Sequence, residues 1–263
     1  MRFKMRSFFT FAFSLMILSL ALCFMNSKTA GAEEVRVAVA SNFHNPLKVI
    51  AGKFEKQSGH KIRAITGSTG KLYAQILHGA PFDLFLAADS KRPLLLEKNG
   101  QAKMGSRLTY AQGRLALWSV NPDAFSVDGI LSLDKMNIKR LALANPKTAP
   151  YGLAARQTLE KLDLWKKLGA RAVRGENIGQ TFQFVLSGNV QLGFVALSQV
   201  LDPKNKSKGK YWKVPSDFHD PLNQDAVLLE RGNGNPAAKD FLEFLKSELA
   251  RKVIISYGYD LPE

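Results

Sequence analysis

The segment Gly67-Ser68-Thr69-Gly70 decides how this sequence folds, because a strand pattern changes to a helix pattern there. Residues 61–65 before it are typical of a strand, and residues 71–77 after it place apolar side chains at helical spacing. The glycines let a ligand approach the backbone, and the first N–H groups of a helix lack intrahelical partners. Such a turn favours an anion. The alternative is that Ser68 and Thr69 only cap the helix.

The same change from strand to helix recurs along the chain. Short apolar or β-branched runs predict strands at 35–40, 61–65, 80–89, 114–120, 139–144, 172–173, 191–197 and 225–230. Helix patterns lie between them, one of which begins with Asn45 as its cap and Pro46 at its first position. Strands that alternate with helices predict parallel β-α-β units with right-handed crossovers. Ligands of such sheets lie beyond the carboxyl ends of the strands.

Uncharged donors occupy the predicted helix starts at this edge. We expect four such starts, two in each of two lobes: Ser41-Asn42, Ser68-Thr69, Tyr151-Gly152 and Ile178-Gly179. A doubly negative ion between them would be held by N–H and O–H dipoles, without Arg or Lys at the site. Simple capping remains the alternative for each turn taken alone.

The first 32 residues are predicted to be a signal peptide. Three early cations precede an apolar run at 7–25, and Ala30-Gly31-Ala32 fits a small-residue cleavage site. An uncleaved anchor is the alternative, since the apolar run is long. The single cysteine, Cys23, lies within this leader, so the exported chain is expected to have no disulfide. The remainder is long enough for one large domain or two lobes of about 100 residues each.

The chain is strongly basic, with a formal net charge of +15. Its cations are mostly scattered singly, and the densest run, at 204–210, is typical of a solvated loop. No predicted helix has a basic stripe, so the charge indicates attraction for small anions or acidic cell-envelope surfaces, and not nucleic acid.

Enzyme signatures are nearly absent from the sequence. The histidines lack metal-ligand spacing, and there is no Gly-x-Ser-x-Gly elbow. Ser41 or Asp89 would be the residues of an exported hydrolase, but no base is marked beside Ser41, and capping or a salt bridge is the simpler role for Asp89. We therefore predict no catalytic residue, no direct metal ligand and no cofactor.

Several motifs in fixed order resemble the periplasmic molybdate-binding proteins of ABC importers. The residues that carry the resemblance lie at 37–43 (Val-Ala-Val-Ala-Ser-Asn-Phe), 67–76, 79–89, 145–152 (Asn-Pro-Lys-Thr-Ala-Pro-Tyr-Gly), 193–198 and 258–262 (Gly-Tyr-Asp-Leu-Pro). The resemblance implies an α/β, two-lobed periplasmic-binding-protein fold of class II type, in which each lobe is a mostly parallel sheet flanked by helices. We assign residues 33–110 and 225–263 to one lobe and 111–224 to the other, with a hinge near residues 110 and 224.

The resemblance also implies the ligand and its contacts. Molybdate or tungstate would be bound by Ser41, Asn42, Ser68 and Thr69 from one lobe and by Tyr151 and Ile178 from the other, with Ile178 acting through its backbone N–H. Many relatives have Ser in place of Thr69, Ala in place of Tyr151, and a donor Tyr in place of Ala196. We expect Tyr151 to supply the donor that Ala196 lacks.

The implied protein is a periplasmic monomer that binds molybdate and tungstate and delivers them to an ABC permease and its ATPase. Sulfate or another small anion in the same fold is the alternative, because sulfate has the same charge and differs in size. An exported hydrolase is a second alternative, and a DNA-binding regulator is disfavoured because no DNA-binding segment accompanies the leader.

Overall fold

The computed structural model describes residues 31–125, 138, 140–203 and 209–262, and residues 33–263 form one compact unit. Most of the predicted leader, with Cys23, and most of the basic run at 204–210 lie outside the described residues. Within the described ranges, no helix has the length and apolar character needed to span a bilayer.

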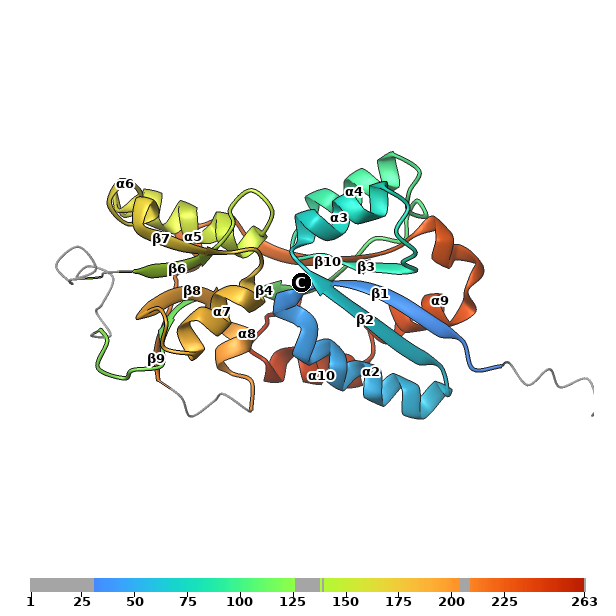
Figure 1. The fold of residues 1–263 in the computed structure, drawn as a ribbon. Coiled ribbons are helices and arrows are strands. Elements are labelled where there is room, and N and C mark those ends of the chain that lie inside the picture. Colours follow the sequence, from blue (N-terminus) through green and yellow to red (C-terminus); the bar gives the residue numbers. More distant parts are fainter. Residues whose placement is uncertain (1–30, 126–137, 139, 204–208, 263) are drawn as a thin grey trace, which may run out of the picture. The chain divides into compact units, whose positions relative to one another are not determined.

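The first sheet has five strands in the order β2-β1-β3-β10-β4 (Figure 1). Its strands β1, β2 and β3 are parallel, and β10 runs antiparallel to both β3 and β4. The bounds are β1 (Glu34–Ala40), β2 (Lys61–Gly67), β3 (Leu84–Leu86), β4 (Leu108–Gly113) and β10 (Leu222–Leu228). We call the part of the molecule built on this sheet lobe 1.

The second sheet also has five strands, in the order β7-β6-β8-β5-β9. Here β6 is parallel to β7 and β8, whereas β5 is antiparallel to β8 and β9. The bounds are β5 (Leu115–Ser119), β6 (Leu141–Ala144), β7 (Ala172–Gly175), β8 (Leu192–Ala196) and β9 (Lys210–Lys213). We call the part built on this sheet lobe 2. The chain crosses between the lobes from β4 to β5 and returns from β9 to β10.

Helices cover both faces of each sheet (Figure 1). In lobe 1, α2 (His44–Ser58), α9 (Pro236–Phe244) and α10 (Glu248–Ser256) pack on one face, while α3 (Thr69–Leu77) and α4 (Lys91–Lys98) pack on the other. In lobe 2, α5 (Pro150–Lys161) and α6 (Trp165–Leu168) face α7 (Ile178–Leu186) and α8 (Leu197–Val200) across the sheet. Short 3-10 turns are η1 (Ser41–Phe43), η2 (Gly169–Arg171), η3 (Ser216–Phe218) and η4 (Glu230–Gly234).

Strand side chains alternate between two apolar cores, which is why the strands read as continuous apolar runs. Val37 and Val39 of β1 enter the core under α2, and Ala38 between them enters the core under α3. In β5, Leu117 points to the α5 side and Trp118 to the α7 side, where it stacks on Phe182 at 4.7 Å. The two-lobed α/β fold predicted from the sequence is confirmed.

Two strands were missed by the sequence analysis and one local prediction was wrong. The missed strands are β4 and β9, which lie at the edges of their sheets and mix polar with apolar residues. The wrong prediction concerns Asn45, which does not cap a helix: the chain turns through η1 directly into α2, and the Asn45 amide donates to Asp202 of lobe 2 at 2.6 Å. That contact spans 157 residues, so local sequence cannot indicate it.

Candidate functional site

The six predicted site residues line one small cavity of about 10 Å³ between the lobes. Its other walls are small or apolar: Ala40, Gly67, Ala88, Ala149 and Pro150. None of the described residues that line this cavity carries a charge. The space is about that of one water molecule, far below the roughly 300–1,000 Å³ of sites for larger organic ligands. The cavity suits only a compact ligand.

Strand ends explain why these residues meet. Ser41 follows β1, Thr69 comes just after β2, and Ile178 comes just after β7. Parallel strands bring their carboxyl ends to the same edge of a sheet, where the chain turns into a helix. The starts of η1, α3, α5 and α7 therefore surround the cavity, and each has first-turn N–H groups without intrahelical acceptors.

The hydroxyls of lobe 1 are arranged as donors. Ser41 Oγ accepts the N–H of Gly179 at 3.2 Å, and Thr69 Oγ1 accepts the N–H of Ala88 at 3.1 Å. Each of these oxygens already accepts a proton, so its own proton is free to be donated to a ligand. Ser68 Oγ is buried and has no hydrogen-bond partner among the described residues. This hydroxyl is therefore free to donate to a ligand in the cavity that Ser68 lines.

Asn42 turns its side chain away from ligand binding. Its Nδ2 group donates to Gln224 Oε1 at 2.7 Å and to Tyr259 Oη at 3.0 Å, so both amide protons are used. What Asn42 can still offer to the cavity is its backbone N–H in η1.

The Tyr151 hydroxyl is buried beside Gly113 and has no hydrogen-bond partner among the described residues. A Cβ built on Gly113 of β4 would lie 2.1 Å from Tyr151 Oη, and Gly113 does not line the cavity. Burial raises the pKa of this hydroxyl well above its ordinary value. The expectation that Tyr151 donates its hydroxyl in place of the missing residue at Ala196 stays a prediction: the ring packs in the core of lobe 2, and the N–H at the start of α5 is the other donor that Tyr151 can offer.

The α7 start is held by its own neighbours. Asn177 caps it by accepting the Gln180 N–H at 3.0 Å, and Gln199 Nε2 donates to Ile178 O at 3.2 Å. Ile178 is buried, and at the first helical position its N–H has no acceptor within the helix.

The two lobes touch around the cavity. Gly70 N–H of α3 donates to Thr148 O of lobe 2 at 2.8 Å, and Lys71 forms an ion pair with Glu176. A Cβ at Gly70 would lie 2.9 Å from Thr148 O and 3.0 Å from Thr148 Cα, so a side chain there cannot be accommodated without movement. The glycine singled out in the sequence thus permits close approach of one lobe to the other.

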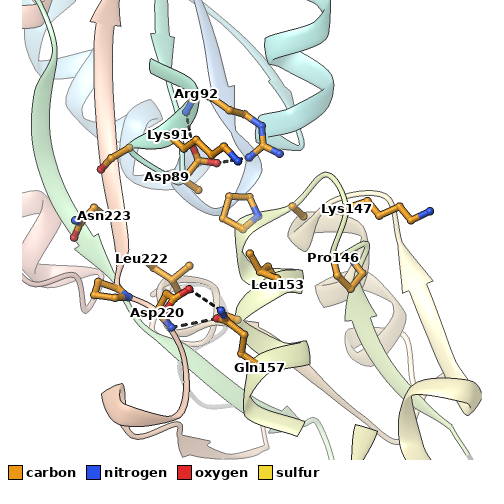
Figure 2. Close-up of a pocket in the computed structure, with 16 residues that line it drawn as sticks. Asp89, Lys91, Arg92, Pro146, Lys147, Leu153, Gln157, Asp220, Leu222 and Asn223 are labelled. Atoms are coloured by element: carbon orange, nitrogen blue, oxygen red, sulfur yellow. Dashed lines mark hydrogen bonds and ion pairs between the residues drawn. The ribbon is translucent and has the colours of Figure 1, made fainter. Parts of the chain in front are cut away.

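A larger pocket of about 460 Å³ adjoins the cavity and shares Ala88, Ala149 and Pro150 with it (Figure 2). Residues of both lobes border it. Asp89 pairs with Arg92 on one side, and Gln157 hydrogen-bonds Asp220 on the other. The flanking cations Lys91 and Lys147 have no ion-pair partner among the described residues. Each lobe therefore places one lysine without an ion-pair partner among the described residues at the rim beside the uncharged cavity.

The arrangement gives no support to hydrolysis. The described residues around Ser41 Oγ supply an N–H donor and no general base, and Asp89 is occupied by Arg92. Within the described part of the chain, no group of three or more His, Cys, Asp or Glu side chains could hold a metal ion.

Sequence reasoning missed Ala88, Ala149 and Pro150 as walls, because small apolar residues have no chemical signature. It also missed Gly113, where a side chain would meet the Tyr151 ring and the Gln224 amide, both distant in the sequence.

Known proteins share this sequence and fold. A sequence model of the family described as bacterial extracellular solute-binding protein matches residues 35–260. The molybdate-binding protein ModA of Azotobacter vinelandii is 50% identical over 232 residues, covering 88% of this chain and 92% of that protein. Its counterpart from Rhodobacter capsulatus is 42% identical over 241 residues, covering 92% and 94%. A solved structure of the periplasmic molybdate-binding protein of Azotobacter vinelandii superposes with a TM-score of 0.83 at 39% identity, covering 87% of this chain and all of that one (100%).

Proposed function

This chain belongs to the bacterial extracellular solute-binding protein family, and we propose that it binds molybdate between its lobes for delivery to an ABC importer. The relatives that bear the name molybdate-binding protein cover most of the chain. We extend the proposal to tungstate, which has the same charge and tetrahedral shape.

The observation that carries the proposal is the buried, unpartnered Ser68 hydroxyl in a cavity without charged walls. Around it we assign hydroxyl donors to Ser41, Ser68 and Thr69 and backbone N–H donors to Asn42, Tyr151 and Ile178. Molybdate is unprotonated at neutral pH and offers only acceptors, so it matches this set. A protonated phosphate would place its own O–H against donors and leave buried groups unpaired.

Sulfate and other small all-acceptor anions are the rival ligands, since donor chemistry alone does not reject them. The size of the cavity must then distinguish molybdate from sulfate, because the metal–oxygen and sulfur–oxygen bonds of the two anions differ in length. An exported hydrolase is disfavoured by the lack of a base beside Ser41 among the described residues.

Delivery implies partners and a location. We infer an ABC permease and its ATPase as partners, a periplasmic location after removal of residues 1–32, and a monomer that opens and closes about the strand crossings near residues 110 and 224. Lobe 1 then consists of residues 33–110 and 225–263, and lobe 2 of residues 111–224. No catalytic activity and no nucleic-acid partner are part of this proposal.

Isothermal titration calorimetry of the protein purified from a host that exports it would test the proposal. We expect tight binding of molybdate and tungstate with one ion per chain, and no heat from phosphate. Tight sulfate binding without a molybdate response would refute the choice of ligand. A crystal soaked with tungstate should place the metal among Ser41, Thr69 and Ile178, and density elsewhere would refute the site.

A further inference from the structure

The C-terminal segment 257–260 contacts both lobes. Asp260 exchanges backbone hydrogen bonds with Gln112 of β4 at 2.8 and 3.0 Å and forms an ion pair with Arg114 at the crossing into lobe 2. Gly258 has a φ of +79°, and a Cβ there would lie 2.5 Å from Leu201 Cδ1, which follows α8 of lobe 2. This segment, part of a motif noted in the sequence, is therefore packed where the lobes join.

Tyr259 places a buried hydroxyl at the centre of this junction. Its Oη accepts from Asn42 Nδ2 at 3.0 Å and lies 2.9 Å from Asn42 O and 3.0 Å from Ser198 Oγ of lobe 2. Ser198 Oγ in turn donates to Asn42 O at 3.1 Å. Gln224, on the returning strand β10, takes the second Nδ2 proton of Asn42. We call Asn42, Ser198, Gln224 and Tyr259 the junction cluster.

The junction cluster holds Asn42, which also lines the cavity, in position. Both Nδ2 protons and the backbone carbonyl of Asn42 are bonded within the cluster, so the position of the Ser41-Asn42 turn depends on these partners. The same hydroxyl that holds Asn42 also reaches Ser198, which belongs to the other lobe. The position of the donor turn in lobe 1 is therefore linked to the position of lobe 2.

We propose that Tyr259 is a positioning residue for anion binding: its hydroxyl holds the Ser41-Asn42 turn in register with lobe 2 while the anion is bound. The inference rests on the proposed function and deepens it. Tyr259 does not line the cavity, so its effect on the anion passes through the cavity residues beside it, which are Asn42 and Tyr151.

Tyr259→Phe tests the proposal, because it removes the hydroxyl and keeps the ring that packs on Phe43 at 5.4 Å. We expect radiolabelled molybdate to dissociate about tenfold faster after a chase with excess tungstate, since one hydrogen bond of ordinary net strength corresponds to a factor of about 5–10. The association rate should change little, because the Tyr259 hydrogen bonds hold the Ser41-Asn42 turn in place after the anion has entered the cavity.

Tyr110→Phe is the matched control. The Tyr110 ring also packs on Phe43, with the ring centroids 4.7 Å apart, and its hydroxyl is buried but has no hydrogen-bond partner among the described residues. Its dissociation rate should equal that of the wild type. Equal rates for all three proteins would overturn the proposal, and a merely structural role for Tyr259 would lower the melting temperature without changing the dissociation rate.

Ser198→Ala extends the test across the lobes and serves also if Tyr259→Phe folds poorly. Ser198→Ala should speed dissociation several-fold, and the double variant should dissociate more slowly than the product of the two single effects predicts, because the two hydroxyls contact each other and share Asn42 O as a partner. Strictly additive effects would contradict the link between lobes. Failure of the wild type to bind molybdate would refute the proposed function. Normal wild-type binding together with an unchanged dissociation rate in Tyr259→Phe would refute only the positioning role.

Discussion

Gly70→Ala should weaken anion binding while leaving the fold intact. The added Cβ would lie 2.9 Å from Thr148 O and 3.0 Å from Thr148 Cα of the opposite lobe. Non-bonded carbon atoms prefer about 3.5–4.0 Å, so the lobes must separate locally by roughly 0.5–1 Å. That movement also breaks or stretches the 2.8 Å hydrogen bond from Gly70 N–H to Thr148 O.

The cost of closure can be worked out from these contacts. Loss of one inter-lobe hydrogen bond is about 0.5–1.5 kcal/mol, and overpacking a close contact adds about 1–3 kcal/mol. A total of about 2–3 kcal/mol corresponds to an affinity about 30–150-fold lower. Within α3, by contrast, alanine is favoured over glycine by up to about 1 kcal/mol, so the free energy of unfolding should not fall.

Calorimetric titration with molybdate and urea unfolding of the ligand-free protein together provide the assay. Gly52→Ala in α2 is the control, because a Cβ there meets no atom within 4 Å and should leave binding unchanged. Wild-type affinity in Gly70→Ala would refute the reasoning, as would a loss of affinity matched by an equal loss of stability.

Other perturbations follow from the same site. Thr69→Ala should lower molybdate affinity about 10–100-fold in a calorimetric titration, because a hydrogen bond to a charged ligand is lost, whereas Thr69→Ser should restore it; equal affinities would exclude the hydroxyl as a donor. Replacing both Lys91 and Lys147 by Gln should slow molybdate association about two- to fivefold in low salt, with no difference in high salt, when measured by stopped flow; a change confined to the dissociation rate would contradict long-range attraction. Burial raises the pKa of Tyr259 from 10.0 to about 12, so the protonated form is favoured by folding; this stability is complete below pH 10 and is lost as the pH rises through 12. Urea unfolding at pH 9 and pH 11 should show the loss, and a smaller loss is expected in Tyr259→Phe.

The sequence predicted those parts of the fold that local chemistry determines. A few consecutive residues are enough to predict the strand at 35–40, the turn at Gly67-Ser68-Thr69-Gly70 and the helices that have one apolar face. The edge strands β4 and β9 were missed because they are stabilised by pairing with a distant strand, and the segment Lys210–Lys213 has charged residues at both ends.

The site was predictable as a set of residues but not as a set of atoms. The six predicted residues do line one cavity, since helix starts gather at the carboxyl ends of strands. Which atom of Asn42 or Tyr151 faces inward depends on Gly113, Gln224 and Tyr259. Those partners are far away in the chain, so no local pattern contains them.

The cavity surrounded by helix starts has a consequence for mutational screening. Half of the donors assigned to it are main-chain groups, which every amino acid except proline supplies equally. Alanine scanning at Asn42, Tyr151 and Ile178 would therefore report the hydrogen bonds and packing of their side chains, and would miss the anion contacts assigned to their backbone N–H groups. Replacing a single backbone amide by an ester through chemical ligation would remove one N–H at a time. The resulting loss of affinity would measure the contribution of that N–H to anion binding.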